Sequence, residues 1–237
     1  MRTDGGLAEN QVTILDSIQT IPQGVLVILS ILFALSYIAL AWWGWSARGF
    51  FDDPARLGLL VAFVLLAALT PACGCNLSRG RIEQPGNDWI FLPLVAAGLI
   101  MGWAAPHEDR IHVWTIEPAA IRYVGLGVFL LGCVLRIGSI LALGERFSVW
   151  VAIQDGHRLM TTGLYRWMRH PSYAGAILTL LGWAMVFRSM LGLALALTMI
   201  PPLISRMAAE ERLLLQEFGR EYVRYHRRTA RLIPGVY

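Results

Sequence analysis

The sequence predicts an all-α integral membrane protein with about six transmembrane helices, the last two a tight helical hairpin, followed by cytoplasmic C-terminal helices. Three observations support this. Hydrophobic residues make up 56% of the chain and charged residues only 15%, whereas a soluble domain carries about 25% charged residues. The mean hydropathy is +0.55. The apolar residues also gather into long runs, which is typical of membrane-spanning helices.

Four apolar runs predict the membrane helices of an N-terminal unit, residues 1–143, because a spanning helix needs about 20 apolar residues. They are Gly24–Trp43, Pro54–Thr70, Trp89–Ala105 and Ala119–Leu143. We expect the second run to end at Pro71 and the polar stretch PHEDRIH after the third to be a loop. Before them, Met1–Gln23 lacks the basic start and early apolar core of a secretory signal, and we expect it to lie along the membrane surface.

The second unit, residues 144–237, contains two shorter apolar runs and a charged tail. Tyr173–Phe187 and Met190–Ile204 are separated only by Arg188 and Ser189, which predicts the hairpin. In the tail, apolar and aromatic residues recur every three or four positions, which predicts an amphipathic helix. Gly219 is expected to break it into two helices.

The distribution of arginines predicts the orientation in the membrane, since cytoplasmic loops carry an excess of basic residues. All 20 basic residues are arginines, and seven of them lie between Arg206 and Arg231. With six crossings, those seven share one side with Arg79, Arg81, Arg146, Arg158, Arg166 and Arg169. The opposite side carries Arg48, Arg56 and Arg110, offset by five acidic residues. Both termini and the 144–172 loop are therefore expected in the cytoplasm.

Several classes of site are not expected. The cysteines Cys73, Cys75 and Cys133 form neither a C-x-x-C pair nor a pattern with histidine at ligand spacing, so neither a disulfide framework nor a zinc site follows. The chain shows no Rossmann glycine pattern and no P-loop. We expect no metal and no nucleic-acid partner.

The first candidate site is the stretch GLYRWMRHPSYAG at Gly163–Gly175. His170 precedes a proline and is biased away from helix, whereas Pro171 suits the first turn of the next helix. A helix N-terminus beside Arg169 favours an anion, and Tyr165 and Tyr173 offer flat faces to a purine or ribose. The alternative interpretation is a basic loop at the membrane edge with tyrosines as interfacial anchors.

The second candidate site is SRMAAEERLLLQEFG, which follows the last apolar run. Arg206 and Glu210 are four positions apart and share one helical face. Ionisable groups at membrane depth are costly and are therefore functional candidates. The alternative interpretation is an ordinary salt bridge within the helix. The hairpin would return the chain to the same side, so the two candidate sites are expected to face each other.

Together these patterns resemble the isoprenylcysteine carboxyl methyltransferase family. The resemblance rests on G-x-Y-x-x-x-R-H-P-S-Y-x-G, the hairpin, R-x-x-x-E-E-x-x-L, F-G-x-x-Y-x-x-Y and a terminal I-P, and covers about Arg146 to Pro234. It implies a methyltransferase module at 144–237 that uses S-adenosylmethionine. Residues implied to bind the cofactor are His157, Leu159, Met160, Tyr165, Arg169, His170, Pro171, Ser172, Tyr173 and Glu210. Arg206 is implied to hold the reacting end of the substrate, and a glutamine contact at Gln154 stays open because the spacing departs from the family's.

The resemblance implies carboxyl methylation of a lipophilic, isoprenylcysteine-like acceptor that enters from the bilayer, with the active site facing the cytoplasm. A phospholipid or a small thiol is the alternative acceptor. Related signatures occur in sterol reductases, so an NADPH-dependent reductase is a second alternative, and a non-enzymatic scaffold or transporter is a third.

Overall fold

The structure, a computed structural model, describes residues 22–74, 82–83, 91–144, 147, 152–153 and 159–235. The expected surface helix before Gln23, as well as Cys75, Gln154 and His157, lies outside the described residues. Within them the chain is mainly helical, and one short ribbon is present in which β1 (Ile82–Glu83) pairs antiparallel with β2 (Ala152–Ile153). This ribbon was not predicted, because two-residue strands leave no periodic pattern in a sequence.

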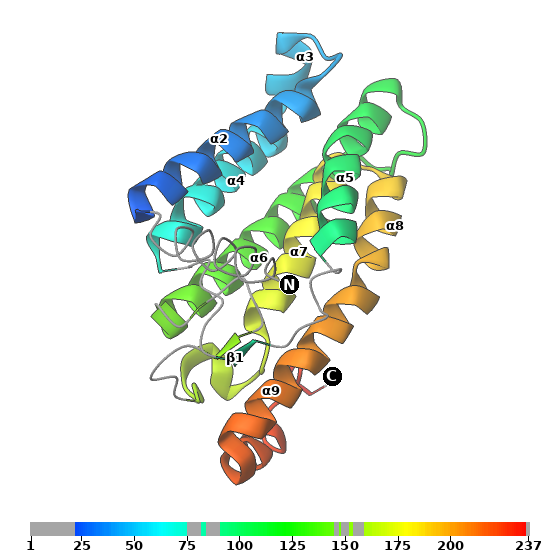
Figure 1. Cartoon of the computed structure of the whole chain (residues 1–237). Coiled ribbons are helices and arrows are strands. Elements are labelled where there is room, and N and C mark those ends of the chain that lie inside the picture. The colour runs from blue at the N-terminus through cyan, green and yellow to red at the C-terminus, as the bar shows by residue number, and fades with distance from the viewer. Residues whose placement is uncertain are drawn as a thin grey trace, which may run out of the picture.

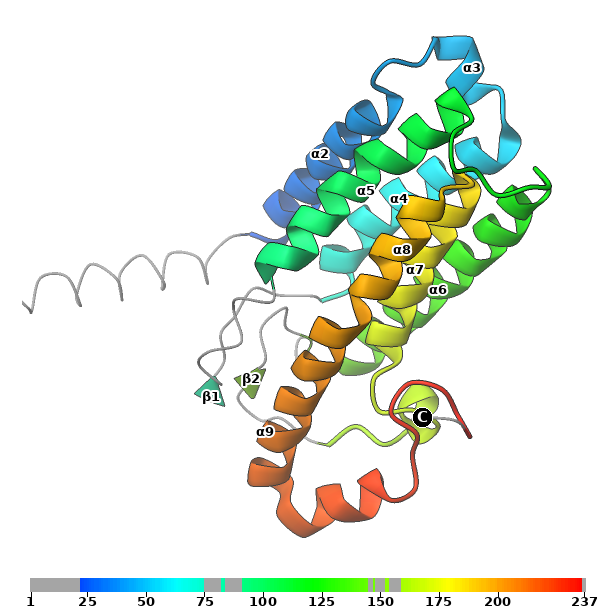
Figure 2. The same ribbon diagram turned by 90° about the vertical axis from the view of Figure 1, so that its right-hand side faces the viewer.

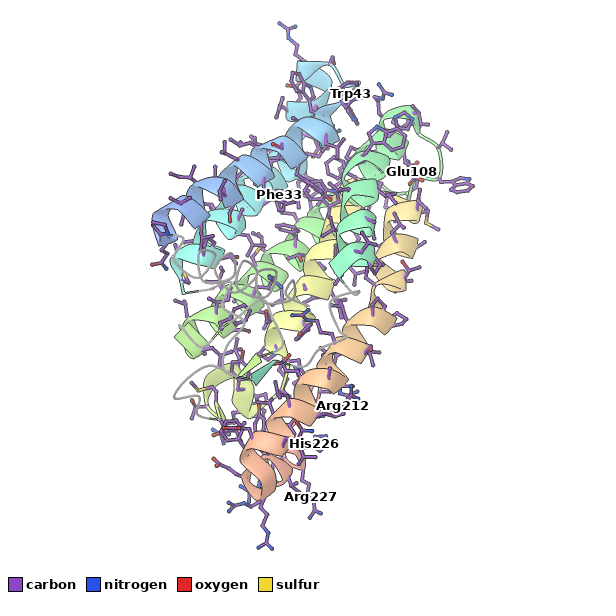
Figure 3. All side chains as sticks on the ribbon, in the orientation of Figure 1. Phe33, Trp43, Glu108, Arg212, His226 and Arg227 are labelled. Atoms are coloured by element: carbon purple, nitrogen blue, oxygen red, sulfur yellow. The ribbon has the colours of Figure 1, made fainter. Side chains whose placement is uncertain are left out.

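The helices follow one another as an elongated bundle (Figure 1). In chain order they are α2 (Gln23–Trp42), α3 (Ala47–Phe51), α4 (Pro54–Ala72), α5 (Phe91–Ile111), α6 (Ile121–Leu143), the 3-10 turn η3 (Gly163–Arg166), α7 (Pro171–Val186), α8 (Met190–Thr198) and α9 (Ile200–His226). Figure 3 shows Trp43 and Glu108 at one end, here called the α3 end, and Arg212, His226 and Arg227 at the other, the α9 end.

Among the residues that the structure describes, four helices are long and apolar enough to cross a membrane, in agreement with the predicted helical membrane protein. They are α2, α4, α6 and the continuous stretch of α8 and α9, Met190–His226. In this last stretch the apolar run ends at Ile204, and charged residues recur from Arg206 onwards. Helix α7 is apolar but shorter. Gly219 interrupts α9 with a non-helical backbone (φ 48°, ψ −119°), at the position where the sequence predicted a break.

Helices α6 and α7 approach each other closely, because glycines face each other between them. A Cβ built on Gly132 would lie 2.7 Å from the carbonyl oxygen of Gly175, and one built on Gly182 would lie 2.5 Å from the backbone nitrogen of Phe129. Small residues at such contacts let membrane helices pack backbone to backbone. The close packing therefore holds in place the N-terminal end of α7, residues 170–173, here called the head of α7.

Helix α5 continues through the PHEDRI stretch, where we expected a loop, and ends at Ile111. The physical reason is that its acidic residues are paired. Ser189 donates to Glu108 Oε2 at 2.6 Å, and Arg122 donates to both oxygens of Asp109 at 2.7 Å. A buried charge is tolerated when it is paired and hydrogen-bonded, so the helix does not have to end before these residues.

Asp109 is the centre of a buried ion network at the α3 end. Besides Arg122, Arg188 donates to its Oδ1 at 3.2 Å, and the Nε of Arg56 lies 3.8 Å from its Oδ2. Arg188 also pairs with Glu117 at 2.8 Å. Arg188 has a positive φ of 52° at the turn between α7 and α8, and this unusual backbone for a non-glycine residue is held by the ion pairs. The network therefore ties the α7–α8 turn to α4, α5 and α6.

Candidate functional site

The head of α7 is built as the sequence predicted. His170 has a non-helical backbone (φ −125°, ψ 57°), and Pro171 occupies the first turn. The carbonyl oxygen of His170 accepts from the amides of Tyr173 and Ala174 at 3.1 Å, so it closes that turn. The His170 side chain is only 2% exposed, and Pro171 and Ser172 are also buried. A stretch read as a possible interfacial loop is thus packed into the protein.

Tyr173 joins the two candidate sites. Its hydroxyl accepts a hydrogen bond from Arg206 Nε at 2.8 Å and donates one to Glu210 Oε2 at 3.0 Å. Arg206 is buried, whereas the Glu210 side chain is 36% exposed. The helical pair Arg206 and Glu210 is therefore bridged from outside by a hydroxyl of α7. The stretches GLYRWMRHPSYAG and SRMAAEERLLLQEFG do face each other.

Glu211 is the residue that sequence reasoning missed. Its Oε1 accepts from Arg169 Nε at 2.9 Å and from Arg231 Nε at 3.1 Å, and lies 3.2 Å from His170 Nε2. An ionised carboxylate only accepts hydrogen bonds, so that histidine nitrogen carries a proton. The signal was present as the second acid of the E-E pair, but its partners are 41, 42 and 20 positions away.

The negative charge of Glu211 is balanced by its contacts with Arg169, His170 and Arg231. Burial opposes ionisation of Glu211, but hydrogen bonds from His170, Arg231 and Arg169 outweigh it and hold its pKa well below the usual range. Glu210 lies on the other side of the same histidine, with its Oε2 at 3.9 Å from His170 Nδ1. His170 therefore stands between two carboxylates, one buried and one reachable from solvent.

Arg169 does not point toward an open anion site. Its NH1 donates to the carbonyl oxygens of His226, at 3.1 Å, and Thr229, while its Nε is held by Glu211. The backbone amide of Arg169 also donates to the Ala230 carbonyl oxygen at 2.9 Å. The guanidinium thus joins α9 and the C-terminal segment to the head of α7.

Tyr165 lies in η3 with its side chain 8% exposed, and burial raises the pKa of its hydroxyl. Its carbonyl oxygen accepts from the Tyr225 hydroxyl at 2.8 Å, which ties η3 to α9. Leu159 and Met160 are half-buried in the segment that leads to η3. The structure thus brings His170, Tyr173, Arg206 and Glu210 together directly, with Arg169 and Tyr165 at the border of that cluster.

Comparisons with known proteins give consistent results. A model of the isoprenylcysteine carboxyl methyltransferase (ICMT) family matches residues 124–216. A protein-S-isoprenylcysteine O-methyltransferase of Schizosaccharomyces pombe is 33% identical over 220 residues, 88% of this chain and 92% of the relative. Protein-S-isoprenylcysteine O-methyltransferase B of Arabidopsis thaliana is 35% identical over 119 residues, and the human protein-S-isoprenylcysteine O-methyltransferase is 34% identical over 119 residues.

The matches differ in extent. The Arabidopsis and human alignments cover 49% of this chain and only 60% and 42% of those relatives. A solved structure of the eukaryotic intramembrane Ras methyltransferase ICMT, without a monobody, matches 91% of this chain and 88% of its own with 22% identity and a TM-score of 0.46. The residues that the family model matches, 124–216, include the head of α7 and the start of α9.

Proposed function

This chain belongs to the isoprenylcysteine carboxyl methyltransferase family, and on that premise we propose that it is a membrane methyltransferase that uses S-adenosylmethionine. The alignment with the fission-yeast relative, which covers 88% of this chain and 92% of that protein, establishes the family and confirms the resemblance read from the sequence. The proposed reaction is methylation of a carboxylate on a lipophilic, isoprenylcysteine-like acceptor. The single observation that supports it most is the Tyr173 hydroxyl held between a basic and an acidic side chain where α9 leaves its apolar part.

The side chains present fit the proposed cofactor by their chemistry. S-adenosylmethionine is a cation with ammonium, carboxylate and ribose groups, so it needs acidic, hydroxyl and aromatic partners together. The cluster offers a partly exposed carboxylate, Glu210, and two tyrosine rings, Tyr165 and Tyr173, from three separate elements. The proposed contacts are His157, Leu159, Met160, Tyr165, Arg169, His170, Pro171, Ser172, Tyr173 and Glu210. Among these, Arg169 contributes by holding the neighbouring residues in place, because its guanidinium is engaged by Glu211 and two carbonyl oxygens.

Arg206 is proposed to hold the carboxylate of the acceptor. A guanidinium binds a carboxylate through two parallel hydrogen bonds, which fixes the direction of its oxygens. The Nε bond to Tyr173 holds the plane of the Arg206 guanidinium. A carboxylate is already ionised at pH 7, so this chain needs no general base.

When bound, S-adenosylmethionine supplies a methyl group on a sulfonium sulfur, which an acceptor oxygen displaces in line while the electron pair of the broken carbon–sulfur bond stays on sulfur. What remains for the protein is positioning. Arg206 orients the acceptor, Glu210 orients the donor, and Tyr173 keeps the two side chains in register, since it bonds to both.

We also propose that α2, α4, α5, α6, α7 and the α8–α9 stretch make six crossings, with α7 and α8 as the hairpin and the α9 end in the cytoplasm. Seven arginines between Arg206 and Arg231 support this orientation. Two exposed positions test it, Trp114 near the α3 end and Arg228 near the α9 end. In a variant without native cysteines, an impermeant maleimide on intact cells should label Trp114→Cys and not Arg228→Cys. The reverse pattern contradicts the orientation.

The proposed function is tested by binding and by turnover on the same purified protein. Calorimetry in detergent should show saturable binding of S-adenosylmethionine, with competition by S-adenosylhomocysteine. Folded protein that binds neither would contradict the methyltransferase proposal, and binding of NADPH would favour the reductase. Labelled S-adenosylmethionine should then transfer its methyl group to farnesylcysteine analogues. Transfer only to an aminophospholipid or to a small thiol would contradict the proposed acceptor and keep the enzyme class.

A further inference from the structure

The C-terminal segment that follows α9 folds back onto the head of α7. In Figure 2 this segment lies beside η3. Arg169 and His170 donate their backbone amides to the carbonyl oxygens of Ala230 and Arg231, at 2.9 and 3.1 Å, and the Ala230 amide donates to Trp167 at 3.2 Å. The segment is thus paired with the stretch that leads into α7, although about 60 positions separate them.

An apolar contact at Leu232 holds the C-terminal segment just after these backbone hydrogen bonds. Leu232 is 8% exposed and packs in a cluster with Leu203 and Met207 of α9, against which Tyr173 of α7 also packs. The residues before and after Arg231 are therefore held, one by backbone hydrogen bonds and one by burial. The position of the Arg231 side chain follows from this arrangement.

The Arg231 guanidinium binds both carboxylate oxygens of Glu211. Its Nε donates to Oε1 at 3.1 Å, and its NH2 donates to Oε2. Arg169 and His170 reach only Oε1 among the hydrogen bonds that the structure describes. The second oxygen of this buried carboxylate is therefore satisfied by Arg231, and the orientation of the carboxylate plane depends on that contact.

We propose that Arg231 is a positioning residue of the methyl-donor site: by holding both oxygens of Glu211, it fixes His170 and Arg169 at the head of α7. This rests on the proposed function, because it assigns a part in the same site. The position lies outside the residues that the family model matches, 124–216. Arg231 acts through Glu211 and not by contact with the reacting groups.

The charged and titratable groups around Glu211 come from three elements. They are Arg169 and His170 before and at the start of α7, Glu210, Tyr222 and His226 on α9, and Arg231 on the C-terminal segment. Removal of the Arg231 charge leaves fewer cations beside Glu211, so the carboxyl takes up a proton at a higher pH than in the wild type. A protonated Glu211 no longer holds His170 through a charged acceptor, and the donor site should loosen in the same pH range.

The experiment compares four full-length proteins in detergent: the wild type, Arg231→Ala, Arg231→Lys and Arg228→Ala. The last is the matched control, an exposed arginine on the same segment. At pH 7 we expect Arg231→Ala to bind S-adenosylmethionine about tenfold more weakly, from the loss of a charge-assisted hydrogen-bond pair. Its affinity should also begin to fall at a higher pH than in the wild type. Arg231→Lys should restore the pH profile, because it keeps the charge, but only part of the affinity.

Two readouts separate this inference from a purely structural role and from the proposed function. A structural role predicts a lower unfolding temperature with wild-type affinity and an unchanged pH profile, and that result overturns the inference. If the wild type binds no S-adenosylmethionine, the proposed function fails and the donor-site part of the inference with it, and acid unfolding then tests the remaining part, that Arg231 holds Glu211 in its ionised form. Arg231→Ala should then unfold at a higher pH than the wild type and Arg228→Ala, and coincident acid transitions overturn it. If Arg231→Ala does not fold, Arg231→Gln, which also removes the charge but keeps more of the side chain, replaces it in the same comparison.

Discussion

Tyr173 and Glu210 meet across two helices, with the hydroxyl on α7 donating to the carboxylate on α9 at 3.0 Å. We expect Tyr173→Phe to lower the rate of methyl transfer far more than the stability, because the ring still packs while both the Arg206 and the Glu210 side chains lose their common partner. The stability cost should be about 1–3 kcal/mol, because two hydrogen bonds to charged side chains are lost. Turnover and thermal unfolding measure the two effects. Tyr123→Phe, the same change at an exposed tyrosine of α6, should alter neither.

Arg206 and Glu210 should differ in role when each is replaced by alanine. Glu210→Ala should weaken binding of S-adenosylmethionine, because it removes the acidic contact. Arg206→Ala should leave that binding nearly intact while methyl transfer drops steeply, and Arg206→Lys should recover little, since a point charge does not replace a planar fork. Cofactor affinity comes from calorimetry and turnover from methyl transfer. Near-wild-type turnover in both alanine variants would mean that the pair is only a salt bridge, worth about 0.3–0.5 kcal/mol.

Asp109 should be among the most sensitive positions for stability, although it lies at the end opposite to the proposed site. Its side chain is fully buried among three arginines. Asp109→Asn should destabilise the protein by about 3–5 kcal/mol, because it leaves buried guanidinium groups without their counter-ion. Glu117→Gln changes an acid of the same network whose side chain is 68% exposed, so its effect should be small. Thermal unfolding in detergent makes the comparison, and equal shifts would contradict it.

Tyr222 and Tyr225 form a matched pair one helical turn apart. The buried Tyr222 hydroxyl has no hydrogen-bond partner among the described residues, whereas the Tyr225 hydroxyl donates to Tyr165 at 2.8 Å. An unsatisfied buried hydroxyl costs free energy, and a satisfied one contributes about 1 kcal/mol. We therefore expect Tyr222→Phe to keep or raise the unfolding temperature and Tyr225→Phe to lower it. Equal decreases would show that Tyr222 has a partner.

Acid should weaken the protein through Glu211. Its folded-state pKa is depressed, because hydrogen bonds from His170, Arg231 and Arg169 outweigh the effect of burial. A depressed carboxyl pKa contributes stability that is present above the unfolded pKa, about 4.3, and is lost as the pH falls toward the folded value. The difference in unfolding temperature between wild type and Glu211→Gln should thus be full near pH 6 and shrink below about pH 4. Glu221→Gln, at an exposed position of α9, should track the wild type throughout.

The sequence predicted the membrane helices well where the apolar runs were long, as in α2 and α6. It failed at the end of α5, because Glu108 and Asp109 read as a loop until their partners on α6 and at the α7–α8 turn are known. Pro71 was expected to terminate α4 but lies in its last turn, since a helix end tolerates a proline that interrupts few remaining bonds.

The candidate site shows the same division. The position of His170 could be predicted from the proline that follows it, and the shared face of Arg206 and Glu210 from their helical spacing. Both patterns involve residues only a few positions apart. The roles of Glu211 and Arg231 depend on contacts that join α7, α9 and the C-terminal segment. Local patterns carry no information on which distant segments meet, so the neighbouring acids 210 and 211 could not be told apart by spacing. Their difference appears only in the fold, where one is partly exposed and the other is enclosed by cations.

The Asp109 network also constrains how the chain is made. Asp109 and Arg122 are only 13 positions apart, so they can pair soon after both leave the ribosome. Arg188 follows Asp109 by 79 positions, and Ser189 follows Glu108 by 81. Until that later stretch is synthesised and inserted, Glu108 lacks its hydroxyl donor. The ion network around Glu108 and Asp109 is therefore complete only when the α7–α8 turn has been inserted. Nascent chains that end before this turn should be the ones removed by membrane proteases.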